Sequence, residues 1–82
     1  MKVTVKLMGR YKDITGKDYI IFDIKNGDSL RDIVDLFVKQ YPMTELDKRR
    51  MMVSKNNIYA SYDTKINDGD EVTLCPPVVS GG

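Results

Sequence analysis

Histidine is absent from this chain of 82 residues, and cysteine occurs once, at Cys75. The lack of histidine removes the side chain that most often serves as a general base or as a metal ligand. A single cysteine cannot form a disulfide within the chain, which excludes a disulfide-stapled secreted scaffold. We therefore expect no metal site and no catalysis that depends on histidine.

Strong charge and long apolar runs are also lacking. The formal net charge is +1, whereas nucleic-acid binding leaves a strongly basic footprint. The basic run Lys48–Arg50 is short and is interpreted as a solvated helix face. No window approaches the ~18 apolar residues of a membrane helix, and residues 1–7 alternate in polarity, unlike a signal peptide. We expect a cytoplasmic protein that binds neither nucleic acid nor membrane.

The length and composition are those of one small soluble domain. Hydrophobic residues make up 41% and charged residues 30% of the chain, which is ordinary for globular proteins. A domain of this size has no room for a deep pocket that encloses a small-molecule ligand. This favours a protein on which other proteins act.

Two segments near the N-terminus alternate apolar and polar residues, as half-buried strands do. They are Val3–Leu7 and Tyr19–Ile24. A turn around Ile14–Lys17, where Gly16 can adopt positive φ, is predicted to join them into a hairpin.

The clearest helix follows. Ser29 is a good N-cap, Asp32 complements the helix N-terminus, and Pro42 ends the helix. Apolar residues recur on one helical face, which predicts that the helix lies across a sheet: Leu30, Ile33, Val34, Phe37, Val38 and Tyr41.

The second half of the chain predicts three more strands. A partly helical connection, Thr44–Arg50, comes first. The predicted strands are Met51–Ser54, Ile58–Ala60 and Glu71–Cys75. A tight turn at Asn56–Asn57 separates the first two, and a turn at Asp68–Asp70 precedes the last. The resulting order, two strands, a helix and three strands, predicts an α+β fold of the β-grasp type. We expect a mixed sheet of about five strands, one main helix on one face, and the first and last strands parallel in the middle. The domain is assigned to residues 1–75 and an extended, flexible C-terminal tail to residues 76–82.

The tail is the most informative segment. It reads Pro76, Pro77, Val78, Val79, Ser80, Gly81, Gly82. Two prolines end the sheet and keep the chain extended, so the tail could reach roughly 23 Å. An α-carboxylate is an anion at neutral pH and must be activated, for instance as an acyl-adenylate, before a nucleophile attacks it. Two glycines would fit a narrow channel of an activating enzyme; the plainer alternative is a frayed terminus.

This ending resembles that of the molybdopterin synthase small subunit family, in the sulfur-carrier branch of the ubiquitin-like proteins. The matching elements are Gly69–Val72, the sequence Pro76-Pro77-Val78 and the final Gly81-Gly82. The family usually has one residue before the glycines, where this chain has Val79 and Ser80.

The resemblance implies a function and partners. An adenylating enzyme related to ubiquitin activators would use ATP to activate the Gly82 carboxylate, and a sulfur donor protein would convert it to a thiocarboxylate. The tail would then enter the large subunit of molybdopterin synthase, which supplies the catalytic residues, and donate sulfur for the molybdenum or tungsten cofactor. Gly82 would be a co-substrate, and the chain would not be catalytic alone and would bind no cofactor of its own.

Other residues are candidates for partner contact or for chemistry of their own. By strand parity, Met8, Thr73 and Cys75 should lie on the sheet face opposite the helix, where a partner could bind. A lone thiol is better interpreted as a small strand residue than as a sulfur-handling group. The carboxylates of Asp68, Asp70 and Glu71 are interpreted as turn and strand-start residues, and Met51-Met52 as core filling.

Three classes of function therefore stay open. The first is a sulfur carrier for molybdopterin synthesis or another thiolation pathway. The second is a ubiquitin-like modifier, in which a lysine amine attacks activated Gly82; the longer tail favours this class slightly. The third is a passive interaction domain, which would tolerate loss of Gly81 and Gly82.

Overall fold

The computed structural model describes residues 1–77. Its elements in chain order are β1 (Lys2–Leu7), α1 (Arg10–Thr15), β2 (Tyr19–Asp23), α2 (Leu30–Gln40), the 3-10 helix η1 (Pro42–Asp47), β3 (Met52–Lys55), β4 (Ile58–Tyr59) and β5 (Glu71–Cys75).

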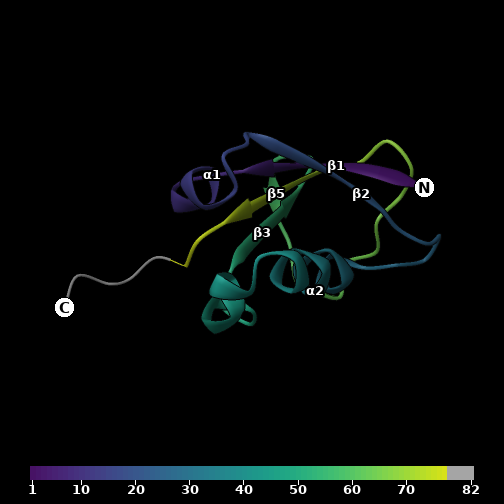
Figure 1. Cartoon of the computed structure of the whole chain (residues 1–82). Coiled ribbons are helices and arrows are strands. Elements are labelled where there is room, and N and C mark those ends of the chain that lie inside the picture. Colours follow the sequence, from purple (N-terminus) through teal and green to yellow (C-terminus); the bar gives the residue numbers. More distant parts are fainter. Residues whose placement is uncertain (78–82) are drawn as a thin grey trace.

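All strands belong to one sheet with the order β2-β1-β5-β3-β4. β1 and β5 are parallel neighbours in the middle, with Val5 opposite Val72, and the remaining pairs are antiparallel. Helix α2 packs across one face, while the other face is open (Figure 1). The predicted β-grasp arrangement is confirmed.

The core lies between α2 and the covered face of the sheet. The alternating residues Val3, Val5 and Leu7 of β1 are all buried, as their period predicts. The ring of Phe37 lies 5.1 Å from that of Tyr11 and 5.3 Å from that of Tyr41, measured between centroids. Full burial of one large apolar side chain stabilises a fold by about 1.5–3 kcal/mol, so this layer dominates the stability.

Helix α2 begins and ends as the sequence predicts. The backbone N–H of Ser29 donates to the Asp32 carboxylate at 2.8 Å, which satisfies a donor at the helix start. Tyr41 has left the helical region, with φ −126° and ψ 78°, because Pro42 follows it.

The connection between the first two strands differs from the prediction. β1 and β2 pair antiparallel, but a helix, α1, stands between them in place of a short turn. Gly16 does have positive φ (70°), as the C-cap of this helix. The helix was missed because six residues are too few to display a helical period.

Smaller corrections concern the ends of elements. β2 ends at Asp23, although Ile24 is still buried. The strand predicted from Met51 begins at Met52, and Met51 itself is core. Lys48–Arg50 forms a turn after η1 and is not on a helix. The tight turn at Asn56–Asn57 is confirmed, with φ values of 53° and 69°.

Candidate functional site

The candidate site begins where β5 ends. Pro76 and Pro77, the first two residues of the predicted tail, are both partly buried. The other predicted tail residues lie outside the described part of the chain: Val78, Val79, Ser80, Gly81 and Gly82.

The start of the tail is held by the middle of the sheet. β5 lies between β1 and β3 (Figure 1), and Cys75 is paired with Met52. The N–H of Met8 donates to the carbonyl of Leu74 at 3.1 Å, one residue beyond the β1–β5 register. Pro76 has no N–H to continue the ladder. The strand therefore ends at Cys75, and the tail starts from a strand that is paired on both sides, with β1 and with β3.

Gly9 lies directly beside the Pro76 ring. A Cβ placed on Gly9 would come within 3.2 Å of Pro76 Cγ and 3.5 Å of Cδ. Gly9 also has φ 55° and ψ −137°, a conformation that L-residues with a side chain rarely adopt. The backbone before α1 and the first proline of the tail therefore approach each other as closely as a glycine allows.

Helix α1 is fixed to η1 through one carboxylate. Tyr11 is fully buried, and its hydroxyl donates to Asp47 Oδ2 at 2.8 Å. The guanidinium of Arg10 donates to the same oxygen. Burial, reinforced by this hydrogen bond and by the negative charge of Asp47, raises the pKa of Tyr11 far above its ordinary value, so the phenol stays protonated. The segment that borders Pro76 is thereby anchored.

A shallow hollow lies on the open face, near the start of the tail. Its volume is about 220 Å³, and its lining comprises Lys6, Met8, Ser54, Asn57, Tyr59, Thr73 and Cys75. The three residues that strand parity assigned to this face, Met8, Thr73 and Cys75, therefore lie together. Tyr59 is 67% exposed at the rim.

Cys75 is not an activated thiol. Burial raises its pKa above the ordinary cysteine value. The thiol is therefore protonated at neutral pH, and the protonated form is a weak nucleophile. This agrees with its interpretation as a small strand residue.

The carboxylates around the last turn have structural partners. Asp70 accepts hydrogen bonds from the Asn67 N–H at 2.7 Å and from the Asn56 side-chain amide at 3.0 Å. These bonds, the backbone one first, lower the pKa of Asp70. Among residues 1–77, no group of three or more His, Cys, Asp or Glu side chains is arranged to hold a metal ion.

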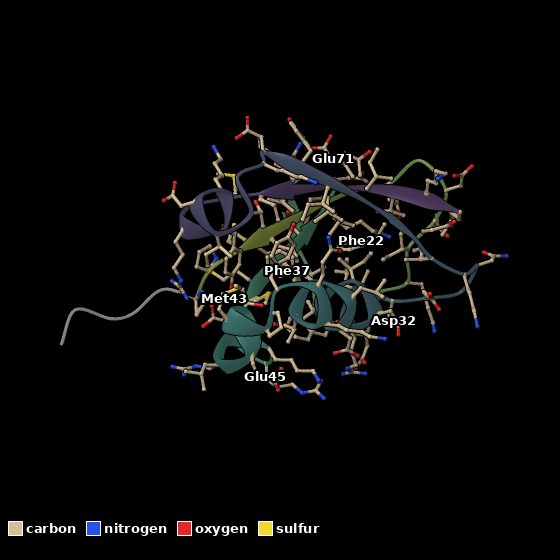
Figure 2. The ribbon with its side chains drawn as sticks, viewed as in Figure 1. Phe22, Asp32, Phe37, Met43, Glu45 and Glu71 are labelled. Atoms are coloured by element: carbon tan, nitrogen blue, oxygen red, sulfur yellow. The ribbon has the colours of Figure 1, made fainter. Side chains whose placement is uncertain are left out.

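A second hollow, of about 310 Å³, lies between the β2–α2 loop and α2. Two of its carboxylates are engaged by the backbone: Asp28 accepts from the Lys25 N–H, and Asp32 from the Ser29 N–H. Figure 2 shows Asp32 on α2, well to the right of the start of the tail. This hollow does not belong to the candidate site.

No helix in the described part of the chain has the length and apolar character to cross a membrane.

Sequence reasoning missed three residues that shape this region: Gly9, Tyr11 and Asp47. The signal that could have found α1 is the pair Tyr11 and Ile14, three residues apart. No local pattern links either residue to Asp47, which is 36 positions from Tyr11 in the chain.

The fold, with one main helix on a mixed sheet and a parallel central pair, is that of the ubiquitin-like proteins. Within that class the chain belongs to the ThiS family, whose pattern matches residues 5–82. The resemblance to the sulfur-carrier branch is thereby confirmed.

Three relatives agree with this assignment. A molybdopterin synthase sulfur carrier subunit from Dictyostelium discoideum is 31% identical over 81 residues, which cover 95% of this chain and 93% of that protein. The structure of a putative molybdopterin converting factor, subunit 1, from Pyrococcus furiosus has a TM-score of 0.81 and 26% identity, with 94% of this chain and 98% of that chain covered. The structure of SAMP1 from Haloferax volcanii also has a TM-score of 0.81 and 26% identity, and both chains are covered completely.

Proposed function

We propose that this protein is a sulfur carrier for molybdopterin synthesis, converted at the Gly82 carboxylate to a thiocarboxylate. The observation that carries the proposal is the family match, which continues through the tail to residue 82. The name of the Dictyostelium relative, a sulfur carrier subunit of molybdopterin synthase, supports the pathway.

The proposed chemistry takes place in two steps on the activating enzyme. A carboxylate oxygen of Gly82 attacks the α-phosphate of ATP, which releases pyrophosphate and leaves an acyl-adenylate. Hydrosulfide supplied by a donor protein then attacks the acyl carbon, and AMP leaves with one of the former carboxylate oxygens, so that Gly82 ends in a thiocarboxylate. Activation is required because the free carboxylate is an anion and a poor electrophile.

Within the synthase, this chain would act as a co-substrate. Its tail, residues 76–82, would thread into the large subunit, whose side chains would catalyse transfer of sulfur to a pterin precursor. Two prolines at the start of the tail support this role, because restricted backbone angles reduce the entropy lost on insertion. The hollow lined by Met8, Thr73 and Cys75 is the proposed contact surface of the domain with a partner.

A second function is favoured by one observation. SAMP1 from Haloferax volcanii matches this chain over its full length, and the same protein is described as small archaeal modifier protein 1. In a modifier, a lysine amine attacks activated Gly82 and an isopeptide bond forms. The additional tail residue, about 3.3 Å of reach, is compatible with this use.

Intact-mass measurement distinguishes these functions. The purified protein is incubated with cell extract, ATP and a sulfur donor, beside a variant that lacks Gly81 and Gly82. A mass gain equal to the exchange of one oxygen for sulfur, absent from the truncated variant, is expected for a carrier. Lysine-linked adducts that end in Gly82 would instead establish a modifier.

An extract that thiolates another carrier serves as the positive control. If this protein then gains no mass in the presence of ATP and forms no conjugate, the proposal is wrong. The remaining interpretation is then a passive interaction domain. Transfer of the sulfur to a pterin precursor by added large subunit would establish the molybdopterin pathway in particular.

A further inference from the structure

We infer that Gly9 is a positioning residue, which sets the path by which the chain leaves the sheet at Pro76. The inference rests on the proposed use of the tail and adds to it a determinant in the folded domain. Gly9 precedes α1 and is remote in sequence from the tail, but it is next to Pro76 in space.

Two independent properties require glycine at position 9. Its φ of 55° strains any residue that carries a side chain. In addition, a Cβ would lie 3.2 Å from Pro76 Cγ, a contact tighter than nine in ten real Cβ contacts, so one of the two residues must move by a few tenths of an ångström. The second property concerns the tail directly, because the Pro76 ring closes on the backbone nitrogen and fixes φ there, so any crowding of Cγ that a change of ring pucker does not relieve acts on the backbone.

The residues around Gly9 cannot easily move to relieve such a contact. The Lys12 N–H donates to the Gly9 carbonyl at 3.1 Å, and the Tyr11 N–H to the Met8 carbonyl at 3.2 Å. Tyr11 is fully buried and bonded to Asp47. Gly9 itself is exposed, so its backbone is held by these hydrogen bonds and by the anchored helix α1, not by surrounding core packing. The displacement would therefore fall on Pro76, the first residue beyond the strand.

A small displacement at Pro76 matters because this residue joins the folded domain to the tail. A shift of a few tenths of an ångström there changes how the proposed contact surface of the domain and the start of the tail are placed relative to each other when one partner binds both. Misplacement of a reacting group by 1 Å can lower a rate about 100-fold. We expect a Cβ at position 9 to lower kcat/KM for adenylation of Gly82 about tenfold.

The chain supplies a matched control. Gly16 also has positive φ (70°), but a Cβ there would meet no atom within 4 Å. Both substitutions place a side chain at positive φ, with the larger strain at Gly9 because Gly16 is in the αL region (ψ 18°) and Gly9 is not (ψ −137°). Only Gly9→Ala creates the contact with Pro76, and the Pro76→Ala background separates this contact from the backbone strain. Both variants are measured for unfolding free energy and for the kcat and KM of thiocarboxylate formation with the activating enzyme.

The expected result is a split between the variants. Both should lose stability, while Gly9→Ala alone should show the tenfold loss in kcat/KM. Pro76→Ala removes Cγ and Cδ, so adding Gly9→Ala to Pro76→Ala should change kcat/KM less than twofold. Equal losses in the two glycine variants, or an unchanged effect of Gly9→Ala in the Pro76→Ala background, would overturn the inference.

A second measurement is independent of sulfur chemistry. NMR of the free protein should show NOEs between the Gly9 Hα atoms and the Pro76 ring, and Gly9→Ala, not Gly16→Ala, should shift the Pro76 resonances. If these NOEs are absent, the inference fails even when thiolation succeeds. If they are present but wild-type protein is never thiolated or conjugated, the proposed function fails and the placement of Gly9 stands.

A further pair of variants tests the inference if the Gly9→Ala protein does not fold. Pro76→Ala loses the ring that contacts Gly9, whereas Pro77→Ala leaves this contact intact. We expect Pro76→Ala to raise KM several-fold more than Pro77→Ala. Equal effects of the two substitutions would contradict the inference.

Discussion

Replacement of Tyr11 by phenylalanine tests how α1 is anchored beside the tail. The substitution keeps the ring packed against Phe37 and removes only the hydroxyl that donates to Asp47 at 2.8 Å. A hydrogen bond to a charged group contributes about 1.5–3 kcal/mol. Arg10 still donates to the same Asp47 oxygen, so the carboxylate keeps a partner and the loss should lie at the lower end. We expect about 1.5–2 kcal/mol, or a fall in Tm of roughly 10 °C for a domain of this size.

Urea unfolding at neutral pH, followed by far-UV circular dichroism, measures this loss. Tyr59→Phe is the matched control, because Tyr59 is 67% exposed on the open face, and its effect should stay within about 0.5 kcal/mol. The m value should not change in either variant. A Tyr11→Phe protein as stable as the Tyr59→Phe protein would refute the argument that the hydroxyl anchors α1 to η1.

Three further outcomes follow from the structure. Phe37→Ala, at a fully buried position, should cost about 3–5 kcal/mol in guanidinium unfolding; Leu46→Ala, at a residue 85% exposed, should cost under about 0.5 kcal/mol, and equal losses would contradict the packing. The lowered pKa of Asp70 makes its contribution to stability complete above the unfolded-state pKa of ~3.9 and lost as the pH falls through the folded-state pKa. Asp70→Asn should therefore destabilise at neutral pH and flatten the acid side of a stability–pH curve; an unchanged curve would exclude this role. Because burial raises the pKa of Cys75, its alkylation by iodoacetamide, followed by mass, should continue to accelerate at pH values where an exposed thiol has reached its plateau; a plateau at neutral pH would contradict this.

Elements whose pattern repeats over many residues could be predicted from the sequence. Helix α2 displays its apolar face over three turns, and β1 shows strict alternation, so both local periods reveal which side is buried. Strand parity also placed Met8, Thr73 and Cys75 on one face, and the structure brings them together around one hollow. Helix α1 offered only the short pair Tyr11 and Ile14, because its anchor is a hydrogen bond from Tyr11 to Asp47, 36 positions further along the chain.

The same reason explains why Gly9 escaped prediction. Its neighbour Pro76 comes next to it only through the β1–β5 pairing, which no local pattern encodes. A glycine before a short polar segment is otherwise typical of an ordinary turn. Gly82, the residue proposed to carry the sulfur, was predicted from the chemistry of its carboxylate and from the resemblance of the chain's ending to a family. It lies outside the described residues.

The position of β5 also governs the order in which the domain can fold. β5 follows every other element in the chain, yet it is the middle strand and pairs with both β1 and β3. During synthesis, β1 and β2 can pair early, but the two halves of the sheet join only when residues 71–75 are available, and such long-range pairing is slow. A chain interrupted before β5 would lack the centre of its sheet. Any partner that binds the folded domain therefore meets only chains in which the last strand, and with it the start of the tail, is already in place.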